Sequence, residues 1–165
     1  MDFRARQKKL LDHLATTGFD ALLISHLPNI HYLCGFTGSA GFLLVEATGS
    51  VFFTDVRYDT QAGDEVKAAK VVIGRKGLLS CLGDFLAARR KPRGWTIGIE
   101  AEHLTVAEKK RLTQALPKGV KLKNVPSLVA RARMVKDPAE LDRICAAVAL
   151  GAKLLDRALE VLRPG

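Results

Sequence analysis

Three evenly spaced glycines mark the first segment that could do chemistry. Gly35, Gly38 and Gly41 punctuate a short segment that leads into an apolar stretch. A dinucleotide-binding loop needs a different glycine spacing and runs from a strand into a helix, and a phosphate loop also needs Lys followed by Ser or Thr. This segment meets neither requirement, so we expect no phosphate site. We interpret the glycines as positions of positive φ or close backbone approach, in a loop that could carry binding groups.

Two histidines and a cysteine lie close together in the sequence. His26, His31 and Cys34 fall within nine residues, whereas the other two histidines are remote. Zinc usually takes more tightly paired ligands and a fourth one, so we expect no metal site here. Ser39 has neither a nucleophile-elbow motif nor an identifiable base, which argues against a catalytic serine.

Two groups of charged residues stand at the ends of predicted strands. The first is Asp55-Val56-Arg57-Tyr58, where a strand gives way to a helix. Asp55 can accept backbone N–H bonds at the helix start, whereas Arg57 could bind a ligand carboxylate with two parallel hydrogen bonds. We favour the structural role and keep ligand contact as the alternative. The second group, Glu100 and Glu102, is expected to be solvated, because two acids alone are usually exposed.

The elements that must position these residues alternate between helix and strand. Apolar residues at helical spacing predict helices, and short apolar runs predict buried strands. The segment 42–54 has the pattern of a hairpin with a glycine turn, which makes the sheet mixed. We therefore predict an α/β fold, a single three-layer-like domain with about six strands flanked by helices, plus a long C-terminal helix. Helices are predicted over 2–17, 29–34, 55–67, 77–90, 103–116, 126–134 and 137–162, and strands over 21–25, 42–46, 50–54, 70–73, 95–100 and 120–125.

The composition is that of a globular chain. Hydrophobic residues make up 48% and charged residues 26% of the 165 residues, which excludes disordered, collagen-like and disulfide-framed classes. The apolar runs are far shorter than the ~20 residues of a membrane span, and the N-terminus has no apolar signal core. Cys34, Cys81 and Cys145 are odd in number and far apart. We therefore expect free thiols in a reducing, cytoplasmic environment.

The net charge of +9 is unevenly distributed. Residues 1–65 carry 5 basic and 8 acidic side chains, whereas residues 66–165 carry 21 and 9. Within the second part, residues 103–136 hold nine basic residues and one acid, Glu108. Such a stretch can bind nucleic acid, face an acidic partner or simply be solvated. Aromatic residues are scarce in it and no nucleic-acid motif is recognised, so nucleic-acid binding is the less favoured alternative.

Three stretches, taken together and in this order, resemble a known family. They are Leu27–Gly41, Phe53–Ala62 and Arg133–Leu141. The chain resembles the N-terminal half of Xaa-Pro aminopeptidases and prolidases, which belong to the pita-bread metallopeptidases and share their architecture with creatinase. Cys34 departs from the family pattern, in which a small polar residue such as Thr is more usual at this position.

The resemblance implies two parts and a mechanism. Residues 1–135 would be a creatinase/prolidase-type domain, and residues 136–165 the linker and first helix of a catalytic pita-bread domain. In the full-length enzyme, two divalent metals (Mn, Co or Zn) would bridge a water that attacks the Xaa-Pro peptide bond. The implied ligands, two Asp, one His and two Glu, belong to motifs that do not occur in residues 1–165. We therefore expect this chain, a truncation or a natural standalone domain, to be inactive alone and to hold no metal.

The resemblance also implies an accessory role and partners. The domain would support homodimerisation, narrow access to a neighbouring active site and act beside the catalytic domain on proline-containing peptides in the cytoplasm. A standalone binding module without catalysis and a creatinase-type amidinohydrolase are the alternatives. The implied substrate-access residues are Phe36, Thr37 and Ser39, and those of the structural motif or ligand contact are Asp55, Arg57 and Tyr58.

Overall fold

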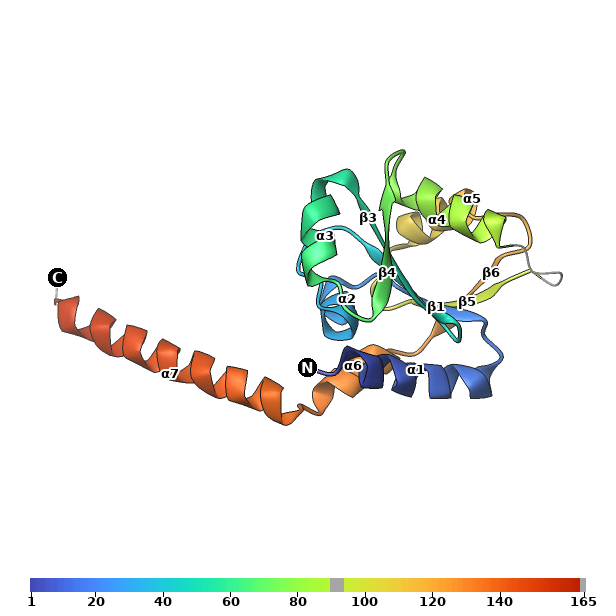
Figure 1. Cartoon of the computed structure of the whole chain (residues 1–165). Coiled ribbons are helices and arrows are strands. Elements are labelled where there is room, and N and C mark those ends of the chain that lie inside the picture. Colours follow the sequence, from blue (N-terminus) through green and yellow to red (C-terminus); the bar gives the residue numbers. More distant parts are fainter. Residues whose placement is uncertain (90–93, 164–165) are drawn as a thin grey trace. The chain divides into compact units, whose positions relative to one another are not determined.

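Helices and strands alternate along the chain in the computed structural model, which describes residues 1–89 and 94–163 (Figure 1). The helices are α1 Phe3–Thr17, α2 Leu27–Cys34, the 3-10 helix η1 Val56–Tyr58, α3 Asp59–Glu65, α4 Leu78–Ala88, α5 Val106–Ala115, α6 Leu128–Met134 and α7 Pro138–Val161. The strands are β1 Ala21–Ile24, β2 Phe42–Glu46, β3 Gly49–Asp55, β4 Ala69–Gly74, β5 Thr96–Glu100 and β6 Lys121–Val125.

Every predicted strand is present, whereas several helices begin later than predicted, such as α6, which starts at Leu128 rather than at residue 126. The helix expected from residue 103 starts at Val106, because the backbone N–H groups of His103 and Leu104 donate to the carbonyl of Glu100 in a turn. The helix expected from residue 55 is divided into η1 and α3. The end expected for the fourth helix falls on residues 90–93, which lie outside the described residues.

The six strands form one mixed sheet in the order β4-β3-β2-β1-β5-β6. Strands β1, β2 and β3 pair antiparallel, which confirms the predicted hairpin. The other pairs, β1 with β5, β3 with β4 and β5 with β6, are parallel. The fold is therefore the predicted mixed α/β sheet, and β1 is the strand at which the order of the sheet reverses.

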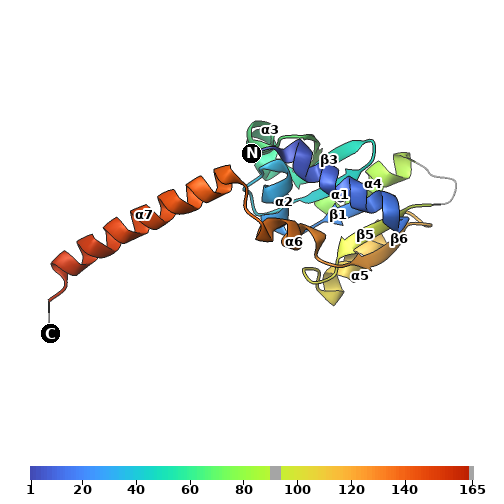
Figure 2. The ribbon, with the colours of Figure 1, turned by 90° about the horizontal axis from the view of Figure 1, so that it is seen from below.

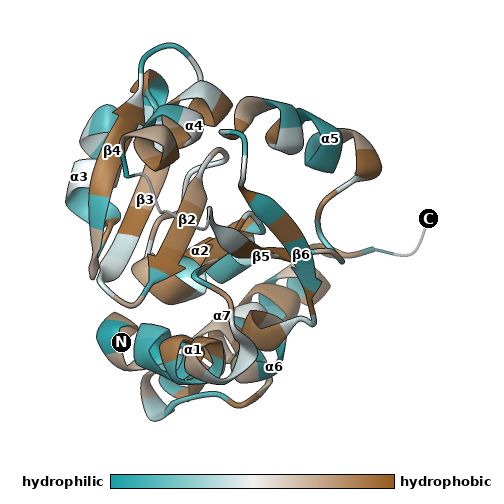
Figure 3. Cartoon of the chain, turned by 90° about the vertical axis from the view of Figure 1, so that its right-hand side faces the viewer, coloured by the Kyte–Doolittle hydropathy of each residue, from teal (hydrophilic) through white to brown (hydrophobic). Residues whose placement is uncertain are grey.

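Helices cover both faces of the sheet, so that the domain has three layers. On one face, Leu22 and Ile24 of β1 pack with apolar residues of α1, α2, α3 and α6. Figure 2 looks onto this side. On the other face, Ala21 and Leu23 pack with α4 and α5. Successive strand residues point to opposite faces, so β1 must be apolar throughout, as its sequence is. Figure 3 shows brown central strands against teal on α5 and β6.

The edge strand β6 explains part of the basic stretch. Lys121 and Lys123 are exposed at this edge, and Lys109 of α5 donates to the side chain of Asn124, 3.0 Å away. Lysines on an edge strand discourage pairing with a second sheet. A solvated edge is thus a sufficient structural reason for these lysines.

The chain divides into two compact units, one of residues 2–131 and one comprising Met1 and the chain from residue 132 onward. In the second unit, α7 begins close to the predicted position, with a capping box in which Asp137 and Glu140 bond reciprocally and with Pro138 in the first turn. Its apolar side chains are exposed, for example 67% for Val148 and 60% for Leu155. Among the described residues, no helix is long and apolar enough to cross a membrane.

Candidate functional site

The glycine loop, residues 35–41, is shaped by close approach of its neighbours. Gly35 ends α2 with φ of 88°, and a Cβ there would lie 3.0 Å from the carbonyl oxygen of Glu65. A Cβ on Gly38 would lie 2.3 Å from Cζ of Phe36 and 2.8 Å from Cε1 of Tyr58. Side chains other than hydrogen therefore do not fit, which confirms the structural interpretation of these glycines.

A carboxylate from α3 holds the start of the glycine loop. The backbone N–H and the hydroxyl of Thr37 each donate to Glu65, both at 2.7 Å. The side-chain amide of Gln61 donates to both Thr37 Oγ1 and Glu65 Oε1, at 3.0 Å each. The hydrogen bonds from Thr37 lower the pKa of Glu65, so this carboxyl is ionised when it anchors the loop.

The middle of the glycine loop packs on Tyr58. The ring of Phe36 is 1% exposed, lying edge-on to Tyr58 with centroids 5.5 Å apart and tilted against Phe52 at 4.5 Å. The hydroxyls of Ser39 and Tyr58 are 2.6 Å apart, and this bond lowers the pKa of Tyr58. Phe36 therefore supports the loop from inside, whereas Thr37 and Ser39 stay at its exposed surface.

Asp55 and Arg57 form a salt bridge with each other at the end of β3. Nε and Nη2 of Arg57 donate to the two carboxylate oxygens of Asp55, both at 2.9 Å, and the backbone N–H of Arg57 also donates to Asp55 at 3.0 Å. The pairing lowers the pKa of Asp55 and raises that of Arg57. Asp55 thus caps η1 while it orients Arg57, whose side chain is 66% exposed.

The polar groups of this site are engaged with one another rather than poised for reaction. The Ser39 hydroxyl faces a tyrosine, and the Thr37 hydroxyl faces a carboxylate that already accepts two other bonds. Covalent catalysis needs a nucleophile with an adjacent base that is itself oriented. The arrangement instead offers a preformed surface of hydroxyls and one exposed guanidinium, which suits binding.

The two histidines and the cysteine that are close in sequence are not brought together as ligands. His31 Nδ1 lies 3.2 Å from the carbonyl of Gly35, while the His26 ring stacks on His103 at 3.7 Å. Cys34 is buried, which raises the pKa of its thiol to about 11. Among the described residues, no group of three or more His, Cys, Asp or Glu could hold a metal ion.

Glu100 differs from the expectation that it would be solvated. It is 4% exposed, and its Oε2 accepts the backbone N–H groups of Ser25 and His26 at 2.8 and 3.0 Å. Its Oε1 accepts the amide of Asn29 at 2.6 Å. The carboxylate therefore ties the end of β5 to the start of α2, where backbone N–H groups lack helical partners. Glu102 is exposed as expected and accepts a hydrogen bond from Ser127.

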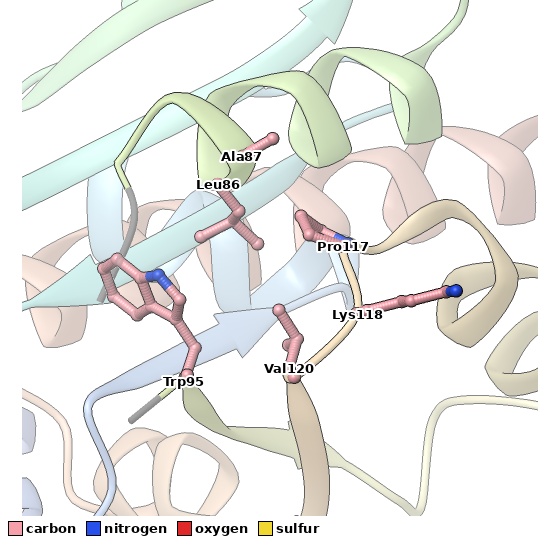
Figure 4. A pocket seen from close by; sticks show the side chains of 8 residues that line it. Leu86, Ala87, Trp95, Pro117, Lys118 and Val120 are labelled. Carbon is pink, nitrogen blue, oxygen red and sulfur yellow. The ribbon is translucent and has the colours of Figure 1, made fainter. Parts of the chain in front are cut away.

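A cavity of about 370 Å³ lies where α4 approaches the turn before β6. Leu86, Trp95, Pro117 and Val120 converge on it, whereas Lys118 extends away (Figure 4). The indole N–H of Trp95 already donates to the carbonyl of Arg89 at 3.2 Å. This cavity therefore presents an apolar wall without reactive groups.

Comparison with known proteins assigns this architecture to a known family. Residues 6–135 match the creatinase/prolidase N-terminal domain. The chain is 26% identical over 158 residues to the uncharacterized peptidase YqhT of Bacillus subtilis, covering 96% of this chain and 44% of that protein. The chain thus spans less than half the length of this curated relative.

Solved structures agree with the sequence match. The N-terminal domain of the cytoplasmic peptidase PepQ from Mycobacterium tuberculosis superposes with a TM-score of 0.67 at 35% identity, covering 77% of this chain and 97% of that one. An Xaa-Pro dipeptidase from Bacillus anthracis has the same fold, with a TM-score of 0.86 at 21% identity, covering 99% of this chain and 45% of that one. Together with the match over residues 6–135, these similarities show that the chain belongs to the creatinase/prolidase N-terminal domain family.

Proposed function

We propose that this chain is the non-catalytic N-terminal half of a metal-dependent hydrolase that cleaves Xaa-Pro peptide bonds. The observation that carries the proposal is the family match over residues 6–135 in a chain that spans only 44% of the YqhT peptidase. The described residues hold no group that could bind a metal, so the two divalent metals (Mn, Co or Zn) and the chemistry would lie in a C-terminal domain that α7 begins. Residues 136–165 would then belong to that domain.

The glycine loop is the part of this domain that we assign to substrate access. Thr37 and Ser39 are exposed on a backbone held by Glu65, Tyr58 and the close contact at Gly38. A loop fixed in this way can narrow a cleft without losing conformational entropy on each binding event. We propose that it faces the peptide cleft of a second copy in a homodimer, and that Arg57 is available there to a substrate carboxylate.

Localisation follows from the same set of observations. The PepQ relative is described as a cytoplasmic peptidase, and the three cysteines of this chain are free thiols. Free thiols persist in reducing compartments. We propose that the protein works in the cytoplasm on proline-containing peptides.

The proposal is tested on the longer protein, which contains residues 1–165 together with whatever the gene encodes after Gly165. That protein is stripped of metal, reloaded separately with Mn²⁺, Co²⁺ or Zn²⁺, and assayed with an Xaa-Pro dipeptide, an Xaa-Pro-Xaa tripeptide and creatine. We expect peptide hydrolysis only after reloading. A stop codon directly after Gly165 would favour a standalone binding module, and hydrolysis of creatine alone would favour the amidinohydrolase. Either result overturns the proposal.

The role of the glycine loop needs its own variants in that longer protein. Thr37→Ala and Ser39→Ala are expected to raise KM for the peptide while kcat changes little, because they touch binding and not the reacting atoms. Thr16→Ala is the matched control, since Thr16 is an exposed hydroxyl on α1 that bonds the carbonyl of His13. Equal KM values for all three variants would contradict the assignment. Sedimentation of the same protein tests whether it is a homodimer.

A further inference from the structure

A second cavity lies at the point where the order of the sheet reverses. From β1 the chain first adds β2, β3 and β4 on one side, and then returns to add β5 and β6 on the other. In open α/β sheets, ligands bind outside the carboxyl ends of the strands at such a point. A cavity of about 280 Å³ lies there, between Ser25, which follows β1, and His103, which follows β5. We call it the β1–β5 crevice.

The body of the β1–β5 crevice is apolar. Its walls come from the start of β2 and from α4, α5 and the turn before α5. Branched aliphatic side chains dominate, which favours a ligand with an aliphatic body of matching shape. The volume falls just below the range of about 300–1,000 Å³ that holds drug-sized molecules, so the fitting ligand is smaller than these. The apolar lining residues are Phe42, Leu78, Leu79, Leu104 and Leu112.

Two of the residues that line the β1–β5 crevice each carry a buried polar atom without a partner. Ser25 Oγ and His103 Nε2 are shielded from solvent, and no atom of the described residues bonds to them. The His103 ring is held in place by stacking on His26, with centroids 3.7 Å apart and planes 7° from parallel. A buried polar group without a partner costs about 1–3 kcal/mol, so a ligand group that reached either atom would gain a hydrogen bond there.

One charge of each sign also lines the crevice, on the same side of α5. Oε2 of Glu108 accepts hydrogen bonds from the backbone N–H and the hydroxyl of Thr105, at 2.9 and 2.7 Å. Oε1 of Glu108 accepts no hydrogen bond from the described residues. Arg111 follows one turn later and also lines the crevice, and its guanidinium makes no hydrogen bond to the described residues. The crevice therefore offers both an acceptor for a cation and donors for an anion.

We propose that the β1–β5 crevice binds a free α-amino acid with a branched aliphatic side chain. The side chain contacts the leucines, the ammonium group bonds to Glu108 Oε1, and the carboxylate pairs with Arg111. A simple fatty acid leaves Glu108 unused and a simple amine leaves Arg111 unused, so the zwitterion matches the lining best. The inference is independent of the proposed peptidase function, because it rests only on residues 25–112 of this chain.

The test titrates the chain with three probes that have the same aliphatic shape. Binding of each probe is followed through the backbone amide shifts in proton–nitrogen correlation spectra. L-Leucine carries both charges, isocaproate lacks the ammonium group, and isopentylamine lacks the carboxylate. We expect L-leucine to cause saturable shifts of the backbone amides of Ser25 and His103 at millimolar concentrations. Each single-charge probe is expected to bind about tenfold more weakly, since each loses one charge-assisted contact.

Variants on α5 separate the crevice from general surface binding. Arg111→Gln is expected to weaken L-leucine about tenfold while it leaves isopentylamine unchanged. Lys110→Gln is the matched control, because Lys110 is an exposed neighbour that does not line the crevice. Three results would each overturn the proposal. The first is the absence of a saturable shift with L-leucine, which would leave water as the occupant. The other two are equal binding of L-leucine and isocaproate, and equal effects of Arg111→Gln and Lys110→Gln on the binding of L-leucine.

Discussion

The glycine loop and the β1–β5 crevice both lie at the end of the sheet where β1, β3 and β5 terminate, but their polar groups are bonded differently. In the loop, hydroxyls and carboxylates bond to one another at 2.6 to 2.7 Å. In the crevice, Ser25 Oγ and His103 Nε2 have no partner among the described residues. A satisfied network fixes a shape, whereas unsatisfied atoms need a ligand. Under the two proposals, the loop would contribute a fixed shape to a site and the crevice would recognise a ligand.

The largest expected effect comes from removing the carboxylate beneath the crevice. Glu100→Ala leaves the donors of Ser25, His26 and Asn29 without their acceptor, and we expect a loss of at least ~3 kcal/mol in the free energy of unfolding. Glu102→Ala, at the neighbouring exposed acid, is expected to change it by less than ~0.5 kcal/mol. Urea denaturation of both variants measures the difference. Equal losses would mean that the bonds of Glu100 do not hold β5 to α2.

The next largest expected effect is a change in unfolding free energy that shows whether the glycine loop can adapt to an added side chain. Gly38→Ala places a Cβ 2.3 Å from the buried Phe36 ring, and we expect it to destabilise the fold by ~1–3 kcal/mol. Gly63→Ala in α3 meets nothing within 4 Å and is expected to stabilise by ~0.5–1 kcal/mol, because alanine favours helix. The two alanine variants should therefore shift the urea midpoint in opposite directions. A shift of the same sign in both would show that the loop yields to the added methyl group.

These two variants also show what the sequence could and could not predict. Runs of apolar residues, and for β6 the alternating pattern of residues 120–125, were enough to predict all six strands, since strand burial is a local pattern. The spacing of Gly35, Gly38 and Gly41 predicted close approach, yet not its partners, because Tyr58 and Glu65 come from a later part of the chain. Glu100 was misjudged because its burial depends on β1 and β5 pairing across a separation of 75 residues.

The crevice was out of reach of sequence reasoning for the same reason. Its lining combines single residues from β2, α4, α5 and the segments after β1 and β5. No pair of these residues has a spacing that indicates binding. Only the sheet order, in which the chain returns to pair β5 with β1 after seven intervening helices and strands, brings Ser25 and His103 together. The capping boxes at Thr105 and Asp137, in contrast, are local motifs, because each joins residues only three apart in the sequence.

The smallest expected effect is a pH dependence confined to the glycine loop. The pKa of Glu65 is lowered below its ordinary value of 4.5, so the loop anchoring is complete above that value and is lost as the pH falls through the folded-state pKa. The backbone amide shift of Thr37 should therefore move toward that of an unbonded amide as the pH falls below 4.5. Glu65→Gln should abolish this titration. An unchanged Thr37 titration in Glu65→Gln would place the responsible group elsewhere.

The central claim is that this chain belongs to a proline-directed peptidase but does no chemistry by itself. Its most direct test is an Xaa-Pro hydrolysis assay of residues 1–165 with added Mn²⁺, beside the protein encoded beyond Gly165 at equal concentration. The account predicts no turnover above buffer for residues 1–165 and metal-dependent turnover for the longer protein. Metal-dependent turnover by residues 1–165 alone would contradict it.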